Sequence, residues 1–321
     1  MLPTPADILA AAYRLRGVIN RTPLVYSKSL SAVVGADVWL KCENLQHTGS
    51  FKLRGAYNAL ASLSPDARQR GIVASSAGNH GLGVAYSAQL LGMRARIFVP
   101  ASAPTVKRDG IIALGADVDA TQPHYDEAHD AAVAYGNAHG MTYVNPCAGA
   151  TLLAGQGTVG LEILEELPDA RMVVIPIGGA GLLGGVATIV RANAPSARIA
   201  GAQGDRSNAM AASIAAGHRV EVAVTPTLAD GLSGQIDEDG FVIGKSLLDE
   251  IHVVSEKDIA NAIAWLAREH DMKVEGSGAV GVAALLTRKL SAPRGPVAVI
   301  VSGGNIDDAV WRDTIAAGVN S

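Results

Sequence analysis

The chain has 321 residues, of which 49% are hydrophobic and 17% charged, and its 26 basic and 30 acidic side chains give a formal net charge of −4. This composition excludes a disordered chain, which needs low hydrophobicity and high charge, and a coiled coil, which needs abundant Glu and Lys. The negative balance disfavours a nucleic-acid binder, because neutralising phosphates requires concentrated positive charge.

The first predicted helix, Pro5–Ile19, has Thr4 as its N-cap, and Asp37–Cys42 is predicted to be a strand. Strands and helices then alternate. The helices of this region are expected at Phe51–Leu63, Asn79–Leu91, Thr105–Leu114, Tyr125–His139, Leu152–Leu167, Leu182–Asn193 and Ser207–Ala216. The strands between them are expected at Gly71–Ser75, Arg94–Val99, Asp117–Thr121, Met141–Val144, Met172–Ile177 and Arg198–Gln203.

The polar, glycine-rich stretch Asp230–Gly244 is predicted to be a long loop. The elements expected after it are strand His252–Ser255, helices Glu256–His270 and Ser277–Lys289, strand Pro296–Val301 and a final helix from Ile306. Such alternation predicts an α/β fold with open, mostly parallel twisted sheets that carry helices on both faces.

Breaker-rich stretches at Ser62–Gly71 and Asn145–Ala150 indicate two domain boundaries. We therefore predict a small domain formed by residues 71–148, inserted into a large domain formed by residues 1–70 and 149–321.

Neither a signal peptide nor a membrane span is predicted. The N-terminal segment lacks a basic region followed by an uninterrupted apolar stretch. Met172–Val190 carries no charge over nineteen residues, but Pro176 and five glycines favour a strand, a turn and a helix over a spanning helix. Cys42 and Cys147 form no disulfide framework or metal motif, so we expect a cytoplasmic protein.

Glycine makes up 36 of the 321 residues and gathers where predicted strands end and helices begin, which is where parallel sheets bind ligands. In the third such corner, residues 178–182 (GGAGL), backbone amides at a helix start can hold an anion. Gly179, Gly181 and Gly184 also match a dinucleotide-binding fingerprint, and Asp205 stands where the ribose-binding acid of that fingerprint is expected. A third interpretation is that these glycines serve close helix–sheet packing.

The first corner, residues 47–55 (HTGSFKLRG), places Lys52 in the opening turn of a helix. A lysine near the positive end of a helix and apolar neighbours loses part of its preference for the ammonium form, and a neutral amine is the nucleophile needed for a Schiff base. Most early-helix lysines are simply solvated. The second corner, residues 75–81 (SSAGNHG), can cradle a carboxylate, and the fourth, residues 302–305 (SGGN), places a neutral hydroxyl at a strand end.

Together with AGQGT at 154–158 and EGSGA at 275–279, these corners resemble the fold-type-II pyridoxal-phosphate (PLP) enzymes, whose fold is that of the tryptophan synthase β subunit. More narrowly, they resemble the threonine/serine dehydratase and serine racemase group. The motifs follow the family's order along most of the chain. On this resemblance the glycine turn binds the phosphate of PLP and not a dinucleotide.

The resemblance implies a role for each matched residue. Lys52 would form the Schiff base with PLP, Phe51 would pack against the pyridine ring, Asn79 would bind its phenolic oxygen, and Ser302 would face its nitrogen. The phosphate would be held by the backbone amides of Gly178, Gly179, Ala180, Gly181 and Leu182. The substrate carboxylate would be held by Ser76, Ala77, Asn79 and His80.

The implied reaction is β-elimination from a β-hydroxy-α-amino acid such as threonine, serine or a 3-hydroxyaspartate, giving a 2-oxo acid and ammonia. A racemase needs a second acid/base opposite Lys52, which the racemase members supply as a serine where this chain has Ala77. Dehydration is therefore favoured over racemisation or β-replacement. An NAD-dependent oxidoreductase and a non-enzymatic ligand-binding protein are the alternatives outside this family.

Several positions depart from the family pattern. Ala180 replaces a glycine of the phosphate turn, so a positive φ there would carry a Cβ penalty. Residues 145–148 (NPCA) replace the common His-Pro-Phe-Asp, which alters the pocket wall. Gln203, Ser207 and Ala209 stand where the racemases place cation ligands, so we predict no metal at that site. Members of the group are commonly dimers, and we expect a homodimer.

Overall fold

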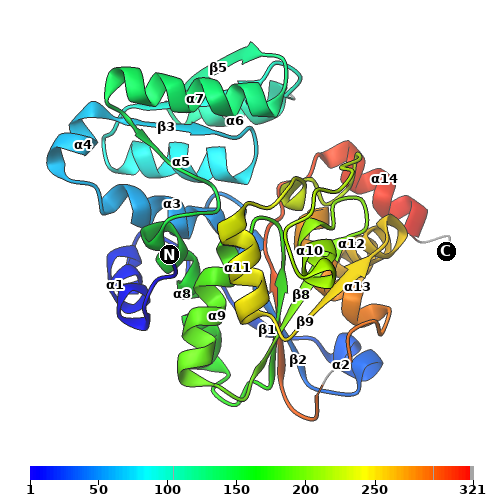
Figure 1. The fold of residues 1–321 in the computed structure, drawn as a ribbon. Helices are drawn as coiled ribbons and strands as arrows, with labels where there is room; N and C mark the ends of the chain where they lie inside the picture. The colour runs from blue at the N-terminus through cyan, green and yellow to red at the C-terminus, as the bar shows by residue number, and fades with distance from the viewer. Residues whose placement is uncertain (104, 292, 319–321) are drawn as a thin grey trace.

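The structure, a computed structural model, describes residues 1–103, 105–291 and 293–318. It contains two sheets, which Figure 1 shows one above the other. The larger sheet has the order β1 (Leu24–Tyr26), β2 (Val38–Cys42), β10 (Val297–Val301), β7 (Met172–Pro176), β8 (Arg198–Gly204) and β9 (Glu250–Val254). The smaller has the order β5 (Asp117–Gln122), β4 (Ala95–Pro100), β3 (Ile72–Ser75) and β6 (Thr142–Tyr143).

Strand β1 pairs antiparallel with β2, while the other strand pairs of both sheets are parallel. This arrangement confirms the predicted fold class. The four strands of the smaller sheet all lie between residues 72 and 143. The exact division into a small domain of residues 71–148 and a large domain remains a prediction.

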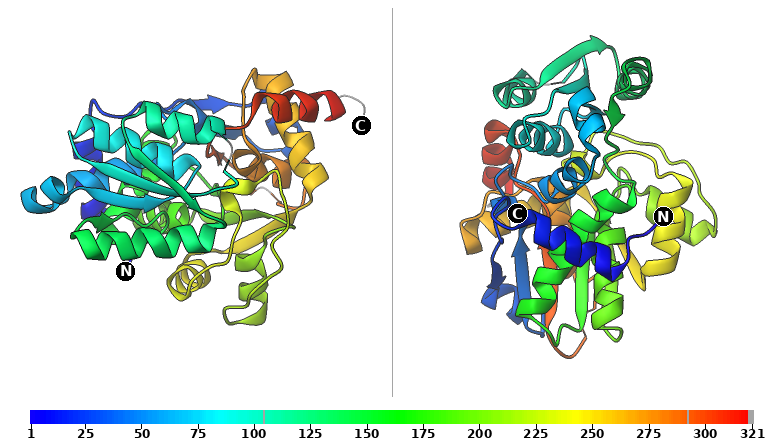
Figure 2. Two further views of the ribbon diagram at one scale, coloured as in Figure 1. Left: turned by 90° about the horizontal axis from the view of Figure 1, so that it is seen from above. Right: turned by 90° about the vertical axis from the view of Figure 1, so that its left-hand side faces the viewer.

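Helices cover both faces of the larger sheet because successive side chains of its buried strands point to opposite sides. Val173 and Ile175 face a core shared with α8 (Ala150–Glu166) and α9 (Gly181–Asn193). Val174 of the same strand faces a second core. The helices of that second core are α2 (Lys28–Val34), α12 (Glu256–His270) and α13 (Gly276–Leu286). Helix α1 (Pro5–Leu15) lies across α8 and α9 (Figure 2).

The smaller sheet is built in the same way. Ile97 of β4 faces the core beneath α5 (Asn79–Leu90) and α6 (Thr105–Ala113), while Phe98 faces α7 (Tyr125–His139). Helix α3 (Lys52–Ala61) contacts both α5 and α8, so it connects the helices that cover the two sheets.

The prediction of a loop over Asp230–Gly244 is wrong. A short 3-10 helix, η2 (Asp230–Leu232), is followed by α11 (Glu238–Leu247). The side chain of Asp237 caps this helix by accepting a hydrogen bond from the Gly240 amide at 2.7 Å, and Phe241 is buried against α9. Gly240 and Gly244 therefore lie inside a capped helix, whereas Gly231 lies in η2 and Gly234, with a φ of 128°, lies between the two helices.

Other differences are short elements and shifted ends. The structure adds β1, α2, η1 (Glu43–Leu45) and α4 (Pro65–Arg70), and the remaining helices are α10 (Ala209–Ala216) and α14 (Asp308–Gly318). Helix α1 ends at Leu15 and not at Ile19, because Gly17 adopts a positive φ of 74°. The apolar run 172–190 is divided between β7 and α9, and within the described ranges no helix is long and apolar enough to cross a membrane.

Candidate active site

The first and fourth glycine-rich corners are joined through their backbones. The Phe51 amide donates to the carbonyl oxygen of Ser302 at 3.1 Å, and Ser50 forms an antiparallel bridge with Gly303. The amide of Gly304 donates to the carbonyl of Gly49 at 2.9 Å. The segment that carries Lys52 is thus fixed to the carboxyl end of β10, in the centre of the larger sheet.

Lys52 is the first residue of α3, and its side chain is half-buried. Its Nζ donates to the carbonyl oxygen of Pro146 at 2.9 Å and lies 4.0 Å from Cys147 Sγ and 5.3 Å from the centre of the Phe51 ring. The amine is therefore held by a neutral acceptor and an aromatic face. Cys147 also touches the glycine turn, so the thiol marks the point where Lys52 and this turn meet.

The glycine turn presents backbone N–H groups that belong to no ladder. The last bond of β7 runs from the Ile177 amide to the carbonyl of Ala202, and the first bond of α9 from the Gly184 amide to the carbonyl of Ala180. The N–H groups of residues 178–183 lie between these two bonds. Together with the positive end of α9, they form an anion-binding cradle.

The backbone of this turn is closely packed. A Cβ on Gly179 would lie 2.8 Å from Cys147 Sγ, and one on Gly181 would lie 3.0 Å from Cys147 Cα. Ala180 adopts the left-handed conformation with φ 66°, so the expected Cβ penalty applies at that residue. Glycine is required on either side of it, because the turn must approach the segment around Cys147.

The second corner lies between β3 and α5. The hydroxyl of Ser76 accepts a hydrogen bond from the Gly78 amide at 3.1 Å, Ala77 is half-buried, and Asn79 begins α5. His80 is buried, and its Nε2 donates to the carbonyl of Val144 at 2.9 Å, which leaves Nδ1 without a partner among the described residues. Burial, together with the charge of Lys52, lowers the pKa of His80 to about 3, so the ring is neutral.

Ser302 is buried at the carboxyl end of β10. Its hydroxyl makes one long hydrogen bond, 3.4 Å to the carbonyl oxygen of Ser277. The hydroxyl of Ser277 has no partner within the described part of the chain. Two neutral hydroxyls are thus left at the end of a central strand with hydrogen-bonding capacity to spare, as a ligand-binding position requires.

Two residues of this site were missed by sequence reasoning. Asn79 Nδ2 donates to Glu275 Oε1 at 2.7 Å, and Asn305 Nδ2 donates to Asn79 Oδ1 at 2.7 Å and to the carbonyl of Thr48 at 2.8 Å. Glu275 and Asn305 belong to EGSGA and SGGN, motifs that were recognised without a role for either side chain. These bonds connect the second corner to the first and fourth.

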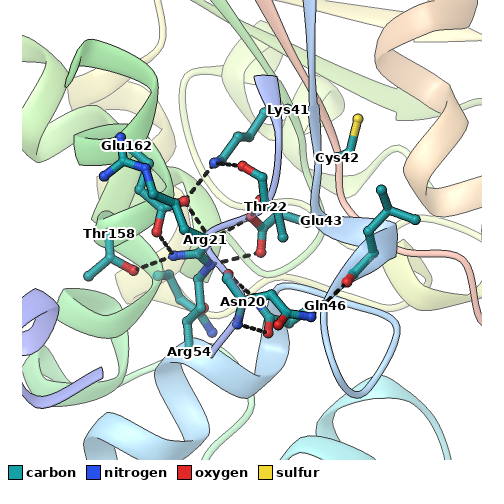
Figure 3. Close-up of polar contacts among 12 residues, drawn as sticks. Asn20, Arg21, Thr22, Lys41, Cys42, Glu43, Gln46, Arg54, Thr158 and Glu162 are labelled. Carbon is teal, nitrogen blue, oxygen red and sulfur yellow. Dashed lines mark hydrogen bonds and ion pairs between the residues drawn. The ribbon is translucent and has the colours of Figure 1, made fainter. Parts of the chain in front are cut away.

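A buried ionic cluster surrounds Arg54 of α3 (Figure 3). Arg54 donates to Glu43 and to Glu162, and Lys41 donates to Glu162 at 2.5 Å and to the carbonyl of Thr22 at 2.5 Å. Burial opposes ionisation of Glu162, but the hydrogen bonds and charges of Arg54 and Lys41 outweigh it and hold its pKa below the ordinary value. The cluster ties α3, and with it Lys52, to β2 and α8.

A candidate metal centre is not evident in the described ranges, where no three His, Cys, Asp or Glu side chains are grouped suitably. Gln203 accepts a hydrogen bond from the Ala211 amide at 3.0 Å, and Ser207 bonds to the backbone of Gly234. The absence of a metal at that position remains a prediction.

Comparison with known proteins identifies the family. The family model described as "Pyridoxal-phosphate dependent enzyme" matches residues 15–303. The chain belongs to this family. The enzyme is 45% identical over 305 residues to the L-threonine ammonia-lyase of Thermotoga maritima, covering 95% of this chain and 76% of that protein. It is 42% identical over 313 residues to the L-threonine ammonia-lyase of Geobacter sulfurreducens, covering 95% and 77%.

Solved structures show the same relationship. The processed form of threonine deaminase isoform 2 from Solanum lycopersicum matches with a TM-score of 0.92 and 34% identity, covering 98% of this chain and 87% of that one. Maize serine racemase matches with a TM-score of 0.93 and 31% identity, covering 100% and 99%. The predicted cofactor and the PLP-dependent lyase class are thereby confirmed, and the dinucleotide interpretation of the glycine turn is set aside.

The site of this PLP enzyme fits its cofactor. The turn at 178–182 offers free N–H groups to a phosphate, Lys52 offers an amine, and Ser302 offers an uncharged partner for the pyridine nitrogen. Close packing of Gly179 and Gly181 against Cys147 leaves the backbone of the turn as the available binding surface. The roles of the individual residues remain predictions.

Proposed function

We propose that the enzyme is an ammonia-lyase that converts a β-hydroxy-α-amino acid, L-threonine first among the candidates, into a 2-oxo acid and ammonia. The observation that carries the proposal is the convergence of all four glycine-rich corners around the Lys52 amine. The relatives named as threonine ammonia-lyases support the choice of substrate. Serine and 3-hydroxyaspartate remain to be compared with threonine directly.

Binding is divided between backbone and neutral side chains. The N–H groups of residues 178–182 hold the phosphate of PLP, Phe51 packs against its ring, and Asn79 binds its phenolic oxygen. Ser76 and the backbone around Ala77 and His80 hold the carboxylate of the substrate. The neutral ring of His80 gives its Nε2 hydrogen to Val144, so His80 can hold the carboxylate only through its backbone N–H.

When bound, PLP supplies an electron sink that stabilises negative charge at the substrate's Cα. Lys52 serves as the base: its amine takes the Cα proton, and the Pro146 carbonyl orients the amine. The β-hydroxyl leaves as water with the proton that Lys52 took from Cα, and hydrolysis of the released enamine gives the 2-oxo acid and ammonia. Ser302 is a neutral partner and does not force protonation of the pyridine nitrogen as an aspartate would, which suits elimination.

Racemisation is the second candidate, because maize serine racemase matches the whole chain at 31% identity. It requires a proton donor on the face opposite Lys52, and the methyl group of Ala77 cannot serve as one. The alanine at position 77 therefore favours elimination over racemisation.

We also propose a cytoplasmic homodimer with a small domain of residues 71–148. Both cysteines are free thiols, which suits a reducing compartment. Light scattering of the purified enzyme tests the oligomeric state, and a mass near that of one chain would contradict the dimer.

The central experiment is an assay of 2-oxo acid and ammonia release across L-threonine, L-serine, their D-isomers and 3-hydroxyaspartate. Lys52→Ala is expected to abolish turnover, and borohydride reduction of the wild type should place the reduced cofactor on Lys52. Enantiomer exchange without ammonia release would overturn the lyase proposal. A reduced adduct elsewhere than Lys52 would overturn its site.

A further inference from the structure

The carboxyl group of Glu275 is buried beside the cofactor-binding corners. The residue is 4% exposed and precedes α13 as its N-cap, but its side chain does not cap that helix. It points instead to the second corner, where its Oε1 accepts the hydrogen bond of 2.7 Å from Asn79. Burying a carboxyl group is costly unless its hydrogen bonds compensate, so this contact needs an explanation.

Asn79 is held at both ends of its amide. Its Oδ1 accepts from Asn305 Nδ2 at 2.7 Å, and its Nδ2 donates to Glu275. The backbone carbonyl of Thr48 can only accept, so Asn305 must present its Nδ2 here. This donor fixes the amide oxygen of Asn79 on the side of Asn305 and its nitrogen on the side of Glu275. One of the two hydrogens on Nδ2 is used in this way, and the other remains for a ligand.

Two glycines make room for this arrangement. A Cβ on Gly303 would overlap Glu275 Oε1 and would lie 3.2 Å from Asn79 Nδ2. A Cβ on Gly49 would overlap the amide of Asn305. Both glycines therefore permit the hydrogen-bonded series from Glu275 through Asn79 to Asn305, which joins the N-cap of α13 to the second and fourth corners.

We propose that Glu275 is a positioning residue, which orients the Asn79 amide so that its second N–H is presented to the phenolic oxygen of PLP. The inference rests on the role of Asn79 in the proposed function. Glu275 acts through Asn79 and needs no contact with the cofactor. The charged groups that face it are Asp230 of η2 and Lys107 of α6, which pair with each other at 3.0 Å.

The test compares cofactor binding in single and double variants of the purified apoprotein, titrated with PLP and followed by absorbance. Glu275→Ala should weaken PLP affinity about tenfold and shift the visible absorption maximum, because Asn79 loses the hydrogen bond that orients its amide. Glu275→Gln retains an oxygen acceptor and should stay within about twofold of the wild type. Asp230→Asn changes a neighbouring charge without touching Asn79 and should leave the affinity unchanged.

The decisive comparison is made in the Asn79→Ala background. There, Glu275→Ala should produce no further loss of affinity and no further spectral shift. An equal loss in both backgrounds would show a merely structural role and overturn the proposal, as would a wild-type affinity in Glu275→Ala. If Glu275→Ala fails to fold, Gly303→Ala is the substitute, because its new Cβ displaces the carboxyl group of Glu275 without removing it. This variant should reproduce the spectral shift, and an unchanged spectrum would count against the proposal.

These outcomes separate the inference from the proposed function. Normal PLP binding and ammonia release in the wild type, with no effect of Glu275→Ala, would overturn the role of Glu275 alone. Failure of the wild type to form a PLP adduct on Lys52 would overturn the proposed function itself.

Discussion

Arg54 and Glu43 form a buried ion pair in which two guanidinium nitrogens, Nε and Nη2, donate to separate carboxylate oxygens at 2.8 Å each. Both side chains are completely inaccessible to solvent. The same guanidinium group also donates to Glu162 of α8 (Figure 3). Arg54 stands two residues after Lys52, so its side chain links α3 to η1 and α8 close to the reactive lysine.

Removing this guanidinium group should destabilise the fold strongly. Arg54→Leu leaves the carboxylates of Glu43 and Glu162 short of a buried partner, and we expect the free energy of unfolding to fall by about 3–5 kcal/mol. Arg21→Leu is the matched control: Arg21 pairs with Glu165 at 2.5 Å, but its side chain is 53% exposed, and its loss should cost less than about 1 kcal/mol. Urea denaturation followed by circular dichroism measures both, and equal losses would contradict the prediction.

The glycine turn gives a prediction about cofactor affinity. In Gly179→Ala the new Cβ would lie 2.8 Å from Cys147 Sγ, so the turn or Cys147 must move and the N–H groups of the turn lose their alignment. Overpacking of this kind typically costs about 1–3 kcal/mol, which corresponds to a dissociation constant for PLP raised roughly 5- to 150-fold.

A glycine outside the turn provides the control for this experiment. In Gly110→Ala of α6 the new Cβ would meet Leu82 at an ordinary distance of 3.4 Å, and affinity should not change. Combining Gly179→Ala with Cys147→Gly should restore binding, because it removes the obstructing side chain. Fluorescence titration of the apoprotein measures all three, and a wild-type affinity in Gly179→Ala would show that the turn does not depend on this contact.

Local chemistry explains which parts of the fold and site could be predicted. The alternation of apolar strands and helices predicts the parallel sheets because each element carries its own period, and Lys52 stands out because of its position at a helix start. The Asn79–Glu275 contact could not be predicted in this way, since 196 residues separate the two and only the assembled sheets bring them together.

Helix α11 shows a different limit of sequence reasoning. Gly240 and Gly244 favour a loop by composition, but a Cβ on Gly244 would overlap the side chain of Met210. Glycine there serves close packing between α10 and α11 and not a turn. The Asp237 cap was the available sequence signal for this helix.

The pKa values of two buried groups in the site are shifted in opposite directions. Burial and the charge of Asp230 raise the pKa of Glu275 from 4.5 to about 8, while burial and the charge of Lys52 lower that of His80 from 6.5 to about 3. Between pH 4.5 and 8 the folded protein holds a proton on Glu275 that the unfolded chain releases, so stability falls as pH rises. His80 acts in reverse, but its contribution is constant above pH 6.5.

The window from pH 6.5 to 8 therefore isolates Glu275. We expect the free energy of unfolding of the apoprotein to decrease across it by at most about 1.4 kcal/mol per pH unit, the limit for one proton. Glu275→Gln cannot titrate and should flatten this dependence. Urea denaturation at half-unit pH steps measures both proteins, and an equally steep decline in Glu275→Gln would assign it to other groups.

Ala77 tests why this site favours elimination. The residue is half-buried in the turn between β3 and α5, two positions before Asn79, and its methyl group offers no proton. In Ala77→Ser a hydroxyl enters the substrate-binding loop, and we expect exchange of the substrate's Cα hydrogen with solvent to rise at least about tenfold, because positioned acid–base groups contribute roughly 10²–10⁴-fold. Proton NMR in deuterated water, with L-threonine as substrate, measures this exchange alongside ammonia release. Ala77→Gly, which also lacks a hydroxyl, is the control and should show no such gain. An equal rise in Ala77→Gly would attribute the faster exchange to looser packing. An unchanged rate in Ala77→Ser would show that Ala77 is not the reason for elimination.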